Sequence, residues 1–144
     1  MGPEVEAARG VAARALGRQD LSRKALGERL ARSGIEADLA ACVIDDLTEA
    51  GYVDERRLAI NHARALAARH YGDEGIAARL AGEGLPAAEI EAAFAELLPE
   101  DARAHVAVRA LTGSIGKRCA ALRRRGFSEA AIEAAAATLD ASDR

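Results

Sequence analysis

A repeated arrangement of leucine and glycine constrains the fold of this chain more than any other feature of its sequence. Three leucines each lie four residues before a glycine, an apolar residue directly follows each glycine, and another leucine lies thirteen residues beyond it. Similarity at a fixed period of about 20 to 50 residues is typical of proteins built from stacked modules. Arg-Ala-Leu also occurs three times, although an alanine-rich helical sequence can produce this tripeptide by chance. The leucine and glycine pairs are Leu30 with Gly34, Leu80 with Gly84, and Leu122 with Gly126.

Within each repeat, glycine and proline separate three segments in which apolar residues recur every three or four positions, a spacing that predicts amphipathic helices. Alanine, the strongest helix former, makes up 37 of the 144 residues, whereas aromatic residues make up 3%. We therefore expect an all-α fold of about nine helices, with caps at Asp20 or Ser22, at Asp54 and at Ser128. The helices should cover about 4–16, 20–33, 36–49, 54–70, 73–83, 86–98, 100–111, 114–125 and 128–139. They should form three tandem three-helix modules, at 1–52, 53–98 and 99–144, stacked in an elongated array that can curve.

Charge is distributed unevenly along these modules, although the net charge is only -3. Residues 109–126 contain six basic residues and no acid, whereas residues 73–101 contain eight acids and one arginine. The first 32 residues contain seven basic residues and four acids. Two basic ends around an acidic middle indicate an anionic partner, either phosphates or an acidic protein groove. The alternative is that these charges are only solvated helix faces.

The sequence lacks a constellation that could perform catalysis or hold a metal. His62, His70 and His105 have no metal-binding spacing with Glu or Cys, and no catalytic motif occurs. His62 is interpreted as a packed or interface histidine rather than a general base. Cys42 and Cys119 are isolated and are expected to be small buried apolar residues. We therefore expect a protein that is not an enzyme and that needs no cofactor.

The N-terminus and the hydropathy pattern predict a cytoplasmic protein. No stretch approaches the roughly 18 consecutive apolar residues that a transmembrane helix requires. The first ten residues contain acids where a signal peptide would carry a basic and then an apolar run. We expect a monomer without a membrane partner.

Four segments in order resemble the RecX family of regulatory proteins, which modulate the RecA recombinase. Residues 18–34 resemble its first module, and 47–59, with Gly-Tyr-Val-Asp-Glu followed by Arg-Arg-Leu-Ala, resemble its most recognisable segment. Residues 72–84 and the basic Arg-Gly-Phe turn in 122–128 also match, so that the resemblance covers about 12–139. The departures are Glu55 for a second Asp, Leu58 for a Phe, and alanines at 134–137 where larger apolar residues are usual. The resemblance implies tandem three-helix repeats and structural roles for Gly34, Gly51, Tyr52, Asp54, Gly72, Gly84, Gly126 and Phe127.

The same resemblance implies a function in DNA repair, recombination and the SOS response. The chain would bind the RecA nucleoprotein filament and alter its assembly, ATP hydrolysis, strand exchange and co-protease activity. The alternative is a helical module that binds DNA directly, although two Tyr, two Phe and no Trp offer little base stacking on single strands. An oligomerising scaffold would explain the helices but not the resemblance. The expected contacts with RecA or phosphate are Lys117, Arg118, Arg123, Arg124 and Arg125, with Arg23, Lys24, Arg64 and Arg69 as secondary candidates.

Overall fold

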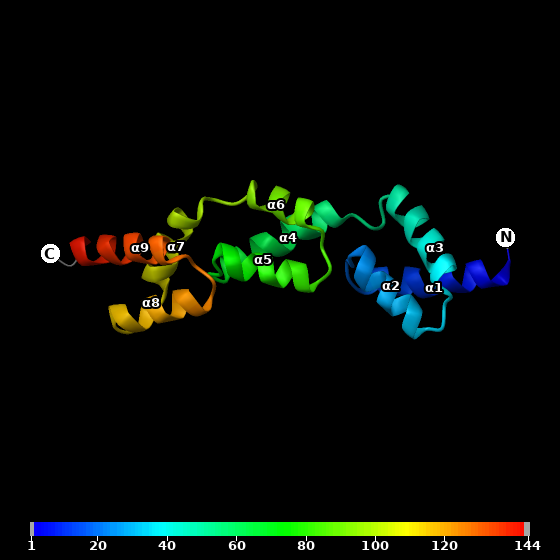
Figure 1. Cartoon of the computed structure of the whole chain (residues 1–144), viewed down its shortest axis with the longest axis horizontal. Coiled ribbons are helices and arrows are strands. Elements are labelled where there is room, and N and C mark those ends of the chain that lie inside the picture. The colour runs from blue at the N-terminus through cyan, green and yellow to red at the C-terminus, as the bar shows by residue number, and fades with distance from the viewer. Residues whose placement is uncertain (1, 143–144) are drawn as a thin grey trace.

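The computed structural model of the chain describes residues 2–142, and over this range it contains nine α-helices and no β-strand. The expected all-α fold is therefore confirmed. Figure 1 shows the helices arranged along one long axis, with the two ends of the chain at opposite ends of the molecule. The helices are α1 (Pro3–Arg18), α2 (Arg23–Arg32), α3 (Ala37–Glu49), α4 (Glu55–Ala68), α5 (Asp73–Gly82), α6 (Ala87–Phe94), α7 (Glu100–Ala110), α8 (Ile115–Arg124) and α9 (Glu129–Ser142).

The array contains three separate hydrophobic cores, each formed by three consecutive helices. We call α1–α3, α4–α6 and α7–α9 the first, second and third modules. Leu30, Leu80 and Leu122 are fully buried, one in each core, which explains why leucine recurs at this position. Val53 is buried in the first core although it lies just beyond residue 52, where the sequence places the first boundary. The residue boundaries of the modules stay a prediction.

Glycine ends the second helix of each module because the backbone there turns into the left-handed region. Gly34, Gly84 and Gly126 have φ values of +81°, +85° and +88°, which side chains other than glycine rarely adopt. The amide of the next residue then bonds back to the buried leucine's carbonyl, as from Ile35 to Leu30 at 3.0 Å. The glycine and the leucine therefore belong to one helix-ending motif.

The expected helix caps at Ser22, Asp54 and Ser128 are confirmed. Ser22 Oγ accepts a hydrogen bond from the amide of Ala25, Asp54 Oδ1 from Arg57, and Ser128 Oγ from Ala131, at 3.0, 3.0 and 3.2 Å. The largest difference from the expected boundaries is at α6, which ends at Phe94 and not near residue 98. Pro99 disfavours a helical conformation at Leu98, so that residues 95–98 form the link to α7.

Neighbouring modules are joined by the same contact at both junctions. The N-terminus of a module's second helix lies against the turn that follows the second helix of the next module. At the first junction, Ser22 Oγ donates to the carbonyl of Glu83 at 2.6 Å. At the second, the amide of Gly72 donates to the carbonyl of Arg125 at 2.8 Å.

A glutamate at the start of the next module's first helix completes each junction. Glu55 Oε2 accepts from the amide of Arg23 at 3.2 Å, and Glu100 Oε2 accepts from the amide of Asp73 at 2.7 Å. Each carboxylate therefore satisfies an amide at the start of a helix that belongs to the preceding module. The repeat thus extends to the way in which the modules dock.

Candidate partner-binding surface

The five basic residues at 117–125 that the sequence predicts as contacts differ in their partners, a difference that the sequence could not show. Lys117 and Arg124 are exposed and have no ion pair within residues 2–142. Arg118 is half-buried and donates to the carbonyls of Gly113 and Val108 at 2.9 and 3.3 Å, which holds the loop after α7. Among the basic residues at 117–125, Lys117 and Arg124 are therefore the ones whose charges are available to a partner.

Arg123 forms an ion pair with Glu129, across the turn between α8 and α9. Its Nη2 donates to Glu129 Oε2 at 3.0 Å, and its Nε also donates to this carboxylate. This hydrogen bond raises the pKa of Arg123 and lowers the pKa of the Glu129 carboxyl. The acid lies just outside the 109–126 window, so the expectation of six uncompensated positive charges was wrong for Arg123.

Arg125 lies at the junction between the second and third modules. Its Nη1 donates to the carbonyl of Arg69 at 2.8 Å, and its guanidinium carbon lies 6.0 Å from the centre of the Tyr71 ring. Arg69 and Arg79 approach the same ring at 5.6 and 4.4 Å, and Arg79 also donates to Tyr71 Oη at 2.9 Å. The fold thus gathers three guanidiniums from α5 and the ends of α4 and α8 around one tyrosine.

Of the other secondary candidates, Arg23 and Lys24 lie at the first junction, whereas Arg64 lies on α4 within the second module. Arg23 donates to Thr48 Oγ1 at 2.6 Å and forms an ion pair with Asp45, which ties α2 to α3. Lys24 is exposed, but the stem of its side chain packs against Gly84. Arg64 forms an exposed ion pair with Glu96 at 3.3 Å. Arg23 therefore has a structural role, whereas the ammonium of Lys24 stays accessible.

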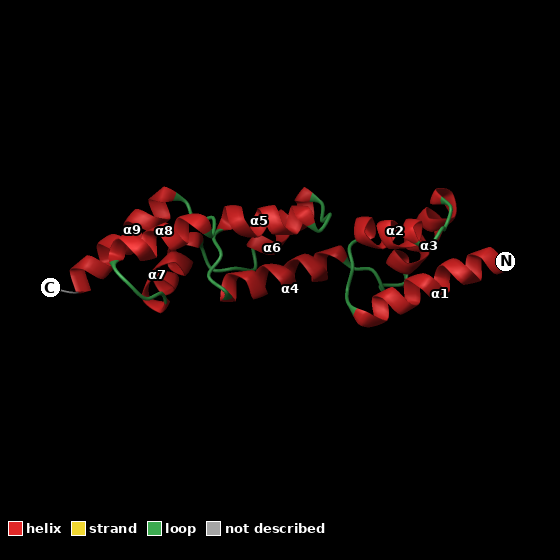
Figure 2. Cartoon of the chain, turned by 90° about the horizontal axis from the view of Figure 1, so that it is seen from below, coloured by secondary structure: helices red, strands yellow, loops and turns green. Residues whose placement is uncertain are grey.

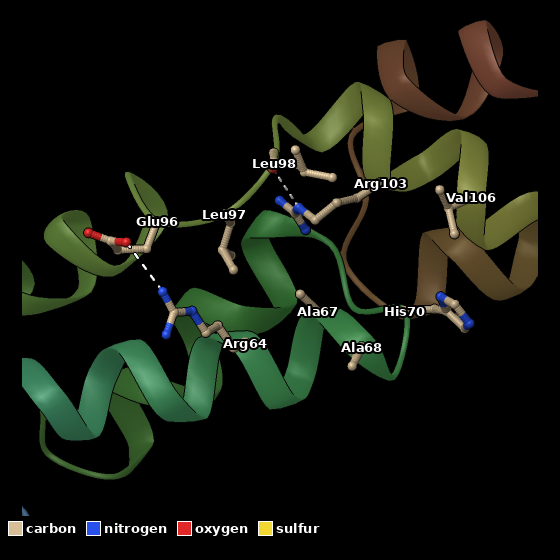
Figure 3. Close-up of a pocket in the computed structure, with 9 residues that line it drawn as sticks. All are labelled: Arg64, Ala67, Ala68, His70, Glu96, Leu97, Leu98, Arg103 and Val106. Atoms are coloured by element: carbon tan, nitrogen blue, oxygen red, sulfur yellow. Dashed lines mark hydrogen bonds and ion pairs between the residues drawn. The ribbon is translucent and has the colours of Figure 1, made fainter.

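An apolar pocket of about 380 Å³ lies between α4 and the link to α7. Figure 3 shows Leu97, Ala67 and Ala68 along it, with Arg64 and Glu96 at one end and His70 and Val106 at the other. Leu98 and Val106 are unusually exposed for large apolar side chains, at 66% and 59%. Apolar side chains at a pocket rim are typical of surfaces that bind another protein.

Two residues that shape this region carried no recognisable signal in the sequence. Arg103 is buried and donates to the carbonyls of Leu98 and Tyr71 at 2.9 and 3.0 Å, and it forms an ion pair with Asp73. Burial raises the pKa of the Asp73 carboxyl, while the charge of Arg103 opposes that shift. His70 has a φ of +66° and so takes the left-handed position that glycine occupies after other helices.

The family-motif residues are placed as follows. Gly51 has a left-handed φ of +87° after α3, and Phe127 is buried in the third core. Tyr52 is 66% exposed, so its expected structural role does not come from burial. Gly72 keeps an extended φ, but a Cβ atom there would overlap the backbone of Gly126 and Phe127. Gly72 therefore allows close approach between the second and third modules.

The expectation that Cys42 and Cys119 are buried is corrected by the structure. Cys42 is exposed, because it lies on the outer face of α3, opposite the buried Ala40 and Val43. Cys119 is half-buried. His62 is half-buried and lies at the surface, where its Nδ1 is 2.6 Å from Glu83 Oε2.

Among the described residues, no group of three or more His, Cys, Asp or Glu side chains could hold a metal ion. No helix in this part of the chain is long and apolar enough to cross a membrane.

Several known proteins are similar to this chain over most of its length. It is 37% identical over 134 residues to "Regulatory protein RecX" of Xanthomonas axonopodis pv. citri (strain 306), which covers 85% of this chain and 83% of the relative. It is 30% identical over 151 residues to "Regulatory protein RecX" of Halorhodospira halophila (strain DSM 244 / SL1), with coverages of 99% and 94%. No family model matches the chain.

The fold is also similar to that of solved structures. The crystal structure of RecX from Lactobacillus salivarius superimposes with a TM-score of 0.86 at 18% identity, covering 97% of this chain and 99% of that one. A second crystal structure, of regulatory protein RecX, gives a TM-score of 0.78 at 16% identity and covers 90% and 71%. At these identities the likeness shows the fold, including the succession of helices along the array.

Proposed function

Because the chain belongs to the RecX family of regulatory proteins, we propose that it regulates a RecA recombinase by binding the RecA nucleoprotein filament. Bound there, it alters filament assembly, ATP hydrolysis, strand exchange and co-protease activity, and so acts in DNA repair, recombination and the SOS response. It acts as a cytoplasmic monomer and performs no chemistry of its own. Family membership is the observation that carries this proposal.

The elongated shape supports a mechanism based on several weak contacts. Three modules follow one another along one axis, so that the chain can touch more than one subunit of a filament (Figure 1). Once one module is bound, the others are held near their own sites at a high effective concentration. Several weak contacts together then give the chain a high overall affinity. Such a ligand bridges neighbouring subunits and changes how they assemble.

The accessible charges at residues 117–125 are the proposed points of contact. Lys117 and Arg124 are exposed without an ion pair within residues 2–142, whereas the guanidiniums of Arg118, Arg123 and Arg125 are engaged inside the chain. An acidic surface of RecA, or phosphates of the filament, would compensate these charges.

RecA-dependent ATP hydrolysis and strand exchange, measured over a range of chain-to-RecA ratios, test the proposal. We expect both to change, and an unaffected filament at every ratio would contradict the proposed function. The variant Lys117→Gln with Arg124→Gln should weaken the effect and make it less sensitive to salt. The control is Arg32→Gln with Arg109→Gln, which removes the same charge from two other exposed arginines.

Direct binding of DNA remains the second candidate function, because unpaired arginines occur along the array. A mobility-shift measurement without RecA separates the two candidates. Strong binding with a steep dependence on salt would favour it.

A further inference from the structure

The first and second modules carry the same hollow, between their first and second helices. One hollow, of about 180 Å³, lies between α1 and α2, and the other, of about 330 Å³, lies between α4 and α5. The six residues that line the first hollow align with the six that line the second, at a spacing of 51 residues in the first helices and of 50 residues from Arg29 onward. The apolar wall, for example, is Ala15 in one and Leu66 in the other. The hollow therefore recurs with the repeat.

Two arginines face each hollow from equivalent positions. Arg18 ends α1 and corresponds to Arg69, directly after α4. Arg29 is the seventh residue of α2 and corresponds to Arg79, the seventh of α5. Each hollow thus receives one guanidinium from each of its two helices. Arg14 adds a third arginine to the first hollow.

No carboxylate forms an ion pair with any of these arginines within residues 2–142. The second hollow contains one acid, Glu83, and that carboxylate is engaged by His62 at 2.6 Å. The position equivalent to Glu83 in the first hollow is Ser33, which carries no charge. Like charges are therefore held together in each hollow, an arrangement that an anion would stabilise.

The helix pairs that line the two hollows are oriented alike in the array. Figure 2 shows α1 beneath α2 in the first module and α4 beneath α5 in the second, with α3 and α6 behind them. One extended ligand lying along these two helix pairs can therefore reach both hollows. The third module does not continue the series, because Ser114 and Ala121 stand at the positions of Arg69 and Arg79.

We propose that the Arg18–Arg29 and Arg69–Arg79 pairs form two equivalent sites for phosphate groups of one nucleic-acid strand. Two planar guanidinium forks, one from each of the two helices that line a hollow, offer more donors than the two oxygens of a carboxylate can use. A phosphate, with its additional oxygens, can engage both forks. The Tyr71 ring is already covered by Arg69 and Arg79, so the site reads the backbone and not the bases.

Binding of a labelled single-stranded oligonucleotide, long enough to span both modules, tests this inference at several salt concentrations. The variants are Arg18→Gln with Arg29→Gln, and Arg69→Gln with Arg79→Gln. Each should weaken binding and reduce the slope of log affinity against log salt by about one for each arginine removed. The control, Arg32→Gln with Arg109→Gln, removes the same net charge outside the hollows and should reduce the slope less. Equal slopes for all three variants would overturn the inference.

Two further measurements test the chemistry of the ligand and the shape of the sites. The lysine variants Arg18→Lys with Arg29→Lys, and Arg69→Lys with Arg79→Lys, keep the charge but lose the fork. We expect them to bind less tightly than the unchanged chain, and equal affinity would overturn the phosphate geometry. If polyglutamate displaced the oligonucleotide as well as unlabelled DNA of equal charge, the occupant would be an acidic protein surface instead. Thermal unfolding shows which variants are folded, and because RecA is absent the outcome is independent of the proposed function.

Discussion

At the scale of single residues, the partner of each guanidinium decides what an arginine does. Arg103 is buried and holds two backbone carbonyls and a carboxylate, so its charge serves the fold. Arg123 is exposed, but its charge is matched by Glu129. Arg124, one position further along, is exposed without an ion pair among the described residues. Neighbours in the sequence therefore differ in whether they can bind a partner.

Arg103→Met should destabilise the chain because the methionine cannot donate to Leu98, Tyr71 or Asp73. We expect a loss of about 2–3 kcal/mol in the free energy of unfolding, at the low end for a broken buried ion pair because half of the Asp73 side chain is in water. Urea denaturation measures this loss. Arg109→Met, on the exposed face of the same helix, should stay within about 0.5 kcal/mol. Similar losses for both variants would contradict the role given to Arg103.

His70→Gly should stabilise the chain, because glycine adopts a φ of +66° without the strain that a side chain causes there. The net gain in the free energy of unfolding should be about 0.5–1 kcal/mol, because part of the relieved strain is offset by the larger conformational entropy of glycine in the unfolded chain. Thermal unfolding of the variant measures it. Ala68→Gly, two residues earlier and still helical, should instead lose about 1 kcal/mol. A loss of stability in both variants would show that the His70 side chain stabilises the turn.

At the scale of helices, the sequence predicts most features because they depend on local chemistry. A cap at Ser22 or Asp54 and a left-handed turn at Gly34 or Gly84 need only the residues within one helical turn. Features that depend on two helices were not predicted. The exposure of Cys42 follows from how α3 is rotated against α1 and α2, and the arginine hollows follow from how two helices face each other.

The turn between α8 and α9 should respond to acid through Glu129. Since its pKa is lowered in the folded chain, the stability it contributes is present above its ordinary value of 4.5 and is lost as the pH falls through the lowered value. An NMR titration of the Glu129 side chain should give a midpoint below 4.5. Arg123→Gln should return the midpoint toward that value, whereas Arg124→Gln should leave it unchanged. A midpoint that does not move in Arg123→Gln would contradict the ion pair.

At the scale of the whole molecule, the two junctions share one pattern but differ in the groups that form them. The first depends on side chains, with Ser22 and Glu55 as the groups that bridge the modules. The second adds a second backbone bond, from Glu74 to Gly126 at 3.2 Å, and a glycine contact so close that no Cβ atom fits. The succession of modules could be read from the repeat of leucine and glycine. The junction contacts, in contrast, bring together residues as far apart as Ser22 and Glu83, 61 positions along the chain, and left no local pattern.

Gly126→Ala should therefore change the shape of the array as well as its stability. The added Cβ would overlap the backbone of Gly75, so that the third module must move away from the second. Gly34→Ala is a matched control, because Gly34 has a similar φ of +81° but no atom of another module within 4 Å of its Cβ position. Both variants should lose about 1 kcal/mol or more through backbone strain. Only Gly126→Ala should alter the small-angle X-ray scattering curve, and identical curves for the two variants would show that the glycine contact does not set the angle between the modules.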